Sequence, residues 1–132
     1  MERPLTEQLR PGGEPPSLKE YEQAGGYQAV RKALHGMAPE EVTQVVADSG
    51  LRGRGGAEFP TGRKWQFIPT GEHAPHPRYL IANADEMEPG TFKDRLLLEG
   101  HPHQLIEGMI LAAYAVQADV AYIFLRWAYK LA

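Results

Sequence analysis

The residues most suited to chemistry lie in a glycine-rich segment that also carries cations and aromatic rings. Glycine adopts conformations closed to other residues and brings bare amide N–H groups against phosphate oxygens, so such a loop can hold a phosphorylated ligand. The cations supply positive charge, and the aromatic side chains supply flat surfaces for a ring. The alternative is a surface turn with basic neighbours. The segment comprises Gly53, Arg54, Gly55, Gly56, Phe59, Gly62, Arg63, Lys64, Trp65 and Phe67.

Two common phosphate-binding motifs do not match this loop. A P-loop requires Lys and then Ser or Thr directly after its last glycine, whereas Gly62 is followed by Arg63, and Lys64 has no hydroxyl residue after it. The dinucleotide fingerprint G-x-G-x-x-G requires a third glycine where Glu58 stands. It also requires a strand just upstream, where the sequence predicts a helix. The glycine-rich loop therefore follows neither of these two motifs.

A second polar cluster directly follows a short apolar run at residues 78–82. Open α/β sheets bind ligands beyond the carboxyl ends of their strands, so an amide and three carboxylates at this point can accept from sugar hydroxyls and ring N–H groups. The alternative is an acidic surface turn. The cluster comprises Asn83, Asp85, Glu86 and Glu88.

Helices are predicted ahead of the glycine-rich loop. Prolines and glycines predict a flexible arm over residues 1–16, and Ser17 with Glu20 then forms a capping box that opens a short helix. Further helices are predicted over 27–35 and 39–49, the second starting with proline and two acids. Its predicted buried stripe comprises Val42, Val45 and Val46.

A strand, a helix and a second strand are predicted after the loop. Residues 78–82 and 119–126 are apolar on both faces, which is typical of fully buried parallel strands. The helix over 102–116 is predicted to use Gly108 for close approach to a neighbour. Together these elements predict a right-handed βαβ unit. The predicted core stripe of the helix comprises Leu105, Ile106, Met109, Ile110 and Ala113.

Composition narrows the class of protein. A chain of 132 residues with 42% hydrophobic content is long enough for one domain. A net charge of −3 and a pI near 5.9 argue against general binding to nucleic acid or anionic membranes. Without a bilayer-length apolar run or a signal-peptide core, the predicted location is the cytoplasm. His73 and His76 are three residues apart, but no further His or Cys lies nearby to complete a metal shell, so solvated side chains are predicted there and at His101 and His103.

Several motifs, in order and at matching spacing, are specific enough to indicate a family. They are Gly50-Leu51-Arg52-Gly53-Arg54-Gly55-Gly56-Ala57, Phe59-Pro60-Thr61-Gly62, Lys64-Trp65, Asn83-Ala84-Asp85-Glu86, Glu88-Pro89-Gly90, Lys93-Asp94-Arg95 and Ile106-Glu107-Gly108-Met109. The chain from Ser17 onward resembles the NADH- and FMN-binding F subunit of respiratory complex I, NADH-quinone oxidoreductase. The same module occurs in the diaphorase subunits of NAD-reducing hydrogenases and NAD-dependent formate dehydrogenases.

The resemblance implies a fold and a set of cofactor-binding residues. Residues 17–132 would form the N-terminal part of an FMN- and NADH-binding domain. This is an α/β, partial Rossmann-like flavin-binding domain with N-terminal helices, a glycine-rich loop and a βαβ unit. Positions on the NADH side are Phe59, Phe67 and Glu88, whereas Glu86 lies in the same turn as the flavin positions Asn83 and Asp85. Positions at FMN are Gly53, Gly55, Lys64, Asn83 and Asp85, with Arg54, Gly56 and Gly62 completing the loop.

The resemblance also implies an activity and partners. Hydride would pass from NADH to FMN and single electrons onward to iron–sulfur clusters and quinone, with no proton-transferring residue or metal ligand required of this chain. The partners would be other subunits of the NADH dehydrogenase module, on the inner face of the membrane without insertion. The family's four-iron cluster requires cysteines, and this chain has none.

Departures from the family pattern leave a second interpretation open. Glu58 stands where the family has glycine, and Ala82 where a cysteine is usual. Trp127 and Ala128 replace a glycine and a glutamate that line the flavin site, and an indole there is predicted to obstruct the flavin. The alternatives are a non-catalytic remnant or interaction module and, less well matched to the motifs, a phosphate-binding regulatory module.

Overall fold

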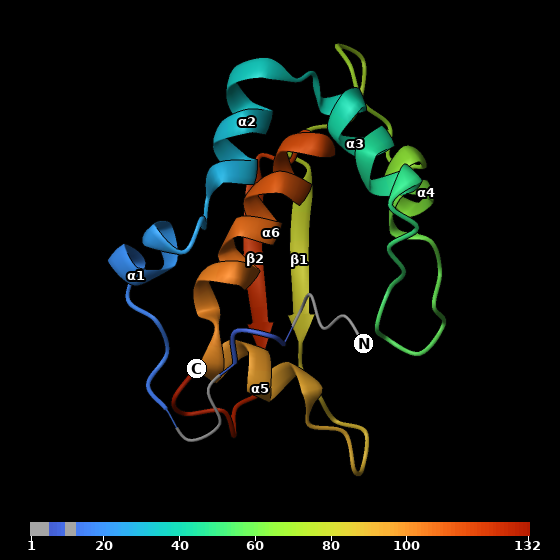
Figure 1. The fold of residues 1–132 in the computed structure, drawn as a ribbon. Coiled ribbons are helices and arrows are strands. Elements are labelled where there is room, and N and C mark those ends of the chain that lie inside the picture. Colours follow the sequence, from blue (N-terminus) through green and yellow to red (C-terminus); the bar gives the residue numbers. More distant parts are fainter. Residues whose placement is uncertain (1–5, 10–12) are drawn as a thin grey trace.

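The computed structural model describes residues 6–9 and 13–132, and places helices against a two-stranded sheet (Figure 1). The predicted arm falls partly on residues 1–5 and 10–12, which lie outside the described residues. The elements are α1 (Leu18–Gln23), α2 (Gln28–Gly36), α3 (Pro39–Asp48), α4 (Thr61–Gln66), β1 (Tyr79–Ala84), α5 (Lys93–Gly100), α6 (Pro102–Ala115) and β2 (Val120–Leu125).

The two strands form the predicted parallel pair. Their register runs from Tyr79 opposite Val120 to Ala84 opposite Leu125. The chain passes from β1 to β2 through two helices, α5 and α6, where the sequence predicts one. The strand–helix–strand arrangement is thus confirmed, and it sets the carboxyl ends of both strands side by side.

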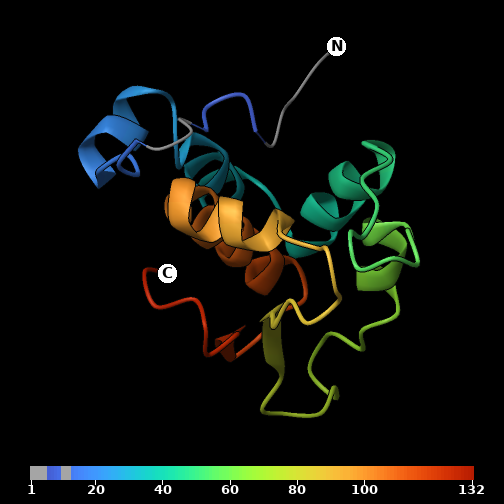
Figure 2. The ribbon, with the colours of Figure 1, turned by 90° about the horizontal axis from the view of Figure 1, so that it is seen from below.

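The prediction that both strands are fully buried is wrong. Burial alternates along β1, where Tyr79 and Ile81 are 57% and 61% exposed and Leu80 is half-buried. All six residues of β2 are exposed. Figure 2 shows the helices gathered on one side of the strands, and no helix among the described residues covers the other side. Apolar side chains on both faces therefore predict a parallel strand, but they do not show whether other elements cover both faces.

The capping signals in the sequence correctly predict where α1 and α3 begin. The Ser17 amide donates to the Glu20 carboxylate at 2.8 Å, and the Glu20 amide donates to the Ser17 hydroxyl at 3.4 Å, which is the predicted capping box. At α3, Pro39 takes the first position, and the Ala38 amide donates to the Glu41 carboxylate at 2.7 Å. Both starts satisfy amides that have no partner within the helix.

The buried stripe of α3 is rotated from its predicted position. Val42 is 5% exposed, as expected, but Val45 is 57% exposed. Thr43 is buried instead, and Val46 and Ala47 are half-buried. The stripe therefore follows positions 42, 43, 46 and 47, because α4 packs on the Ala47 side of the helix.

Two predictions about α6 are also corrected. Ile106 is 40% exposed, so it is not a core residue. A Cβ atom built at Gly108 meets nothing within 4 Å, so this glycine does not serve close packing. Early in α6, Leu105 packs against the cluster of Ala84, Leu98 and Tyr129, and at the end of the helix Ala115 packs with Ala33 and Val42. Across residues 6–9 and 13–132, no helix combines the length and the apolar character that a bilayer crossing requires.

Candidate functional site

The glycine-rich loop is closed at its neck by backbone hydrogen bonds. The Gly53 amide donates to the Phe59 carbonyl at 2.9 Å, and the Thr61 amide donates to the Leu51 carbonyl at 2.8 Å. These bonds flank a bridge between Arg52 and Pro60. The two ends of the loop are therefore fixed to each other, and α4 begins directly after the neck.

The glycines of this loop face open space. A Cβ atom built at Gly55 or Gly56 meets nothing within 4 Å, and the nearest atom to one at Gly53 is the Phe59 carbonyl oxygen at 3.6 Å. Gly56 has φ +101°, a conformation that other residues rarely adopt. The space beside these glycines is thus open to a ligand, although the Gly53 amide itself already donates to the Phe59 carbonyl.

Glu58 takes a left-handed backbone conformation, with φ 50°. This is the position at which the family pattern has glycine, the residue that adopts positive φ without steric cost. Glu58 in place of glycine therefore has local backbone strain, and it adds a carboxylate to the loop.

The segment after the loop is a short helix that the sequence does not predict. In α4, Gly62 is buried, and a Cβ atom at this position would lie 2.4 Å from the backbone of Ala47 in α3. The bare glycine lets the two helices touch. Of the predicted site residues, Gly62 thus has an observed packing role, and its contact fixes the helix that carries Lys64.

A cavity of about 650 Å³ lies between this loop, α4 and β1. It brings together four predicted site residues, namely Gly53, Gly55, Phe59 and Lys64. The cavity is also lined by Ala57, Glu58, Thr61, Trp65, Ile68, Arg78, Tyr79, Leu80, Ile81 and Val116. The other predicted residues do not line it: these are Arg54, Gly56, Gly62, Phe67, Asn83, Asp85, Glu86 and Glu88.

Sequence reasoning missed the contribution of β1 to this cavity. Treating the strand as buried on both sides removed Tyr79 and Ile81 from consideration, although they form its exposed face. Arg78 precedes the strand and donates through Nη1 to the Pro69 carbonyl at 3.0 Å and through Nε to the Gln117 carbonyl at 2.8 Å. Its charge adds to that of Lys64 at the cavity wall.

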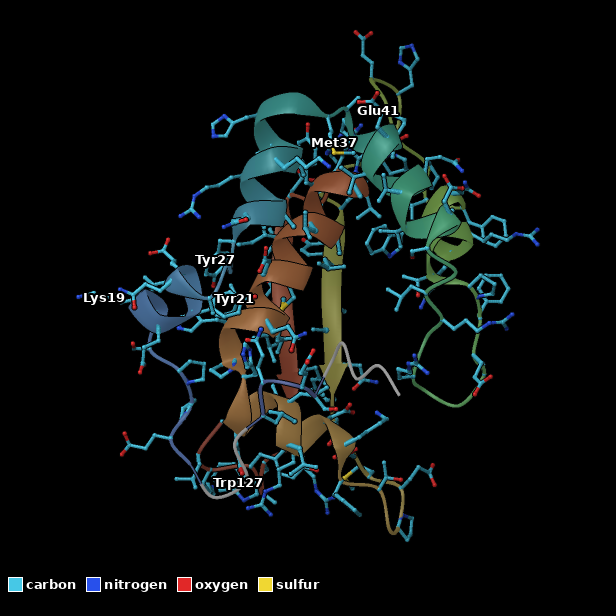
Figure 3. All side chains as sticks on the ribbon, viewed as in Figure 1. Lys19, Tyr21, Tyr27, Met37, Glu41 and Trp127 are labelled. Atoms are coloured by element: carbon cyan, nitrogen blue, oxygen red, sulfur yellow. The ribbon has the colours of Figure 1, made fainter. Side chains whose placement is uncertain are left out.

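The two aromatic residues predicted on the nucleotide side lie close together. The ring centroids of Phe59 and Phe67 are 6.1 Å apart, with a tilt of 46° between the planes. Phe67 does not line the cavity but is 66% exposed, so its ring is available to a ligand beside Phe59. Trp127, by contrast, is 85% exposed and does not line the cavity. Figure 3 shows it at the opposite end of the molecule from α3.

The acidic turn follows β1 directly, at the carboxyl end of the strand. The Asn83 side-chain oxygen accepts from the Asp85 amide at 3.1 Å, which fixes the first bend of the turn. Glu88 is exposed. Glu86 differs from its neighbours because it is only 5% exposed and its carboxylate is engaged within the protein.

Four groups surround the Glu86 carboxylate. It accepts from the amides of Asp94 and Arg95 at 3.1 and 3.4 Å and from the Tyr129 hydroxyl at 2.8 Å, and the Lys93 ammonium lies 3.9 Å away. Burial opposes the charge, but these hydrogen bonds and the ammonium outweigh it and hold the pKa of Glu86 below its usual value. Glu86 is therefore ionised at neutral pH.

The prediction of a solvated His101 is wrong. Its side chain is 4% exposed, and its Nε2 atom lies 3.0 Å from the Gln8 side-chain oxygen. Burial lowers the pKa of His101, and the nearby His103 lowers it further. The ring packs edge-on against Tyr21, which also hydrogen-bonds to Glu107 on α6.

Comparison with known proteins identifies the family. Residues 46–132 match the model of the Nuo51 FMN-binding domain. The chain belongs to this family. The match covers the loop, α4, both strands and the acidic turn, and it includes every residue predicted for the site.

Similar proteins come from several bacteria. The chain is 53% identical over 126 residues to the F subunit of NADH-quinone oxidoreductase of Escherichia coli (strain K12), covering 96% of this chain and 28% of that protein. It is 55% identical over 115 residues to the F 2 subunit of the same enzyme of Rhizobium meliloti (strain 1021), covering 87% of this chain and 27% of that protein. The chain thus spans less than a third of the length of these relatives.

A solved structure shares the fold. A chain of the NAD⁺-reducing [NiFe]-hydrogenase in its air-oxidized state superimposes with a TM-score of 0.70 and 47% sequence identity. The match covers 89% of this chain and 20% of the hydrogenase chain. The expected α/β flavin-binding fold is therefore confirmed by sequence and by structure.

The residues at the cavity fit the cofactor that the family name indicates. The Gly55 backbone borders open space, and Lys64 and Arg78 supply positive charge, which suits a phosphate. Trp65 and Tyr79 supply apolar walls for a ring, and the volume lies within the usual range for small-ligand sites. Among the lining residues, Glu58 carries a charge that opposes a phosphate.

Proposed function

We propose that this chain forms part of the FMN site of an NADH-oxidising flavoprotein subunit of the complex I type. The observation that carries the proposal is the cavity between the glycine-rich loop, α4 and β1, because it joins amides, a lysine and aromatic walls within the region matched to an FMN-binding domain. FMN, when bound, supplies the hydride acceptor for NADH.

Each group of residues has a distinct task in this proposal. The Gly55 amide holds the FMN phosphate, with the Arg54 and Gly56 backbone shaping the loop around it, while Gly53 closes the neck of the loop through its bond to the Phe59 carbonyl. Lys64 stabilises negative charge at the flavin ring, because an ammonium in a partly enclosed cavity interacts more strongly with an anion than in water. Phe59 and Phe67 offer stacking surfaces for the rings of NADH.

The acidic turn provides the complementary acceptors. Asn83 and Asp85 orient the flavin from the carboxyl end of β1, where open α/β sheets bind ligands. Glu88 is exposed and accepts from nucleotide hydroxyls. Phe67 and the acidic groups lie outside the cavity lining, so in this proposal they contact the parts of the ligands that extend beyond the cavity.

The proposed partners follow from the relatives. The chain would work beside other subunits of an NADH dehydrogenase module, on the cytoplasmic side of the membrane. With no cysteine, it supplies no thiolate to an iron–sulfur cluster, so any cluster that receives electrons is held elsewhere. The likeness to the NAD⁺-reducing hydrogenase supports a second assignment, the equivalent diaphorase subunit, which would use the same FMN site with a different electron acceptor.

Titration of the folded chain with FMN, followed by quenching of flavin fluorescence, tests the proposal. Saturable binding is expected, and Lys64→Ala should raise the dissociation constant by about tenfold, which corresponds to loss of one charge-assisted contact of about 1.4 kcal/mol. Lys32→Ala is the matched control, because it removes the same charge from an exposed position on α2. The control should bind FMN like the unchanged chain.

Two outcomes would count against the proposal. Absence of FMN binding by a chain with normal circular dichroism would favour the non-catalytic interaction module. Equal effects of Lys64→Ala and Lys32→Ala would mean that binding depends on net charge and not on this cavity.

A further inference from the structure

Glu86 lies between residues proposed to bind the cofactor, yet its carboxylate is turned into the protein. Its side chain is 2% exposed, and both carboxylate oxygens already have hydrogen-bond donors. Oε1 faces the Asp94 amide and the Lys93 ammonium, and Oε2 faces the Arg95 amide and the Tyr129 hydroxyl. Neither carboxylate oxygen of Glu86 is therefore free to bind a flavin.

The first two donors belong to the start of α5. The amides of Asp94 and Arg95 occupy the second and third positions of this helix, where backbone N–H groups have no partner within the helix. No side chain of the N-cap residue, Phe92, satisfies them. The Glu86 carboxylate performs this task from outside the helix, with the helix dipole favouring its charge.

The remaining contacts join the turn to the segment after β2. The Tyr129 hydroxyl donates to Oε2 at 2.8 Å, and Arg126 Nη1 donates to the Glu86 backbone carbonyl at 2.5 Å. Tyr129 itself is 7% exposed and packs with Ala84 and Leu98. The guanidinium groups of Arg95 and Arg126 each lie 5.8 Å from the centre of its ring.

We propose that Glu86 is a positioning residue that works with Tyr129 to fix the acidic turn against α5 and the segment after β2. In this role it sets the positions of Asn83 and Asp85 without contacting the cofactor, an inference that rests on the FMN site proposed above. The strands hold the turn at one end, since pairing continues to Ala84 opposite Leu125. The Glu86 network holds the turn beyond the last strand pair.

Tyr129→Phe distinguishes a positioning role of Glu86 from direct contact between Glu86 and FMN. The substitution removes only the hydroxyl that donates to Glu86 and leaves the Glu86 carboxylate in place. We expect the dissociation constant for FMN to rise about five- to tenfold and the visible circular dichroism of bound FMN to change, since a hydrogen bond to a charged group is lost. Glu86→Gln should act in the same direction. The double variant should add little to either change, because both residues act through one network.

Tyr114→Phe is the matched control. It also removes one hydroxyl hydrogen bond, from Tyr114 to the Met37 carbonyl at 2.6 Å, but in the core between α6 and the α2–α3 connection. It should lower thermal stability and leave FMN affinity and circular dichroism unchanged. A general loss of stability would instead affect FMN binding in both tyrosine variants.

Amide NMR shifts of Asn83, Asp85 and Glu88 provide a readout that needs no FMN. Tyr129→Phe should move these shifts, and Tyr114→Phe should not. Unmoved shifts would overturn the positioning role whether or not FMN binds, whereas moved shifts with no FMN binding by the unchanged chain would refute only the proposed function. Weaker FMN binding in Glu86→Gln with normal binding in Tyr129→Phe would make Glu86 a direct contact and overturn the inference.

Discussion

Replacing Gly62 by alanine tests how closely α4 is held against α3. The added Cβ would lie 2.4 Å from the Cα and N atoms of Ala47 and 2.6 Å from its Cβ. Carbon atoms in contact are normally about 3.5–4.0 Å apart, so α4 must move by about 1 Å or more. The nearest neighbouring atoms are backbone, which cannot turn aside as a flexible side chain can.

The expected magnitude follows from two opposing terms. Overpacking of a close contact costs about 1–3 kcal/mol, and alanine in place of a helical glycine returns up to about 1 kcal/mol. A contact of 2.4 Å with backbone atoms lies at the severe end of overpacking, so the net loss for Gly62→Ala is about 2 kcal/mol, or a fall in Tm of about 7 °C for a domain of this size. FMN affinity should fall as well, because the displaced helix carries Lys64.

Gly108→Ala is the control for this prediction. Gly108 is also helical, but its added Cβ meets nothing within 4 Å, so only the propensity gain of about 1 kcal/mol remains. Thermal and urea unfolding, followed by circular dichroism, should therefore shift in opposite directions for the two variants. Stabilisation by Gly62→Ala, or equal shifts in both variants, would refute the packing argument.

Two further predictions concern Glu58 and His101. Glu58→Gly should relieve the left-handed backbone strain and remove a negative charge that repels the FMN phosphate. The dissociation constant for FMN should therefore fall while Tm changes little. Weaker FMN binding would contradict this prediction. Burial lowers the pKa of His101 in the folded chain below the unfolded-state value of about 6.5. As pH falls below about 6.5, the unfolded chain takes up the proton first, so the free energy of unfolding declines. Above that pH, this group causes no loss of stability. In His101→Gln, the fall in Tm between about pH 7.5 and pH 5 should be shallower, and an unchanged slope would exclude His101 as its cause.

Features that depend on neighbouring residues in the sequence were predictable. The Ser17–Glu20 capping box and the proline start of α3 are local hydrogen-bond arrangements, and both occur as expected. The strand pair followed from two apolar runs with a long helix between them. The space beside Gly55 and Gly56 also follows from local chemistry, because these residues have no side chains to fill it.

Features that depend on distant partners were not predictable. The exposure of Tyr79 and Ile81 depends on which face the helices cover, and the exposure of Val45 depends on the side from which α4 packs. The burial of His101 depends on Tyr21 and Gln8, far away in the sequence. A sequence pattern records the apolar content of a segment, but the packing partner decides its orientation.

The acidic turn shows the same limit within the proposed site. Asn83, Asp85, Glu86 and Glu88 are near neighbours with similar chemistry, so no local pattern separates them. Of these four, it is Glu86 whose side chain meets the start of α5 and the Tyr129 hydroxyl. The division between inward and outward carboxylates is thus set by tertiary contacts, one of them with a residue 43 positions along the chain.

The closed neck of the glycine-rich loop has an entropic consequence. Fixing the backbone of one residue costs about 1–2 kcal/mol at room temperature, and glycine loses more conformational freedom than other residues. Because bonds between residues 51–53 and 59–61 already restrain the loop ends, that freedom is lost when the chain folds and not when a ligand arrives. Only the residues within the neck remain to be ordered on binding. The closed neck therefore lowers the ordering cost that amide contacts to an anion must offset, and the remaining cost falls on the residues between Gly53 and Phe59.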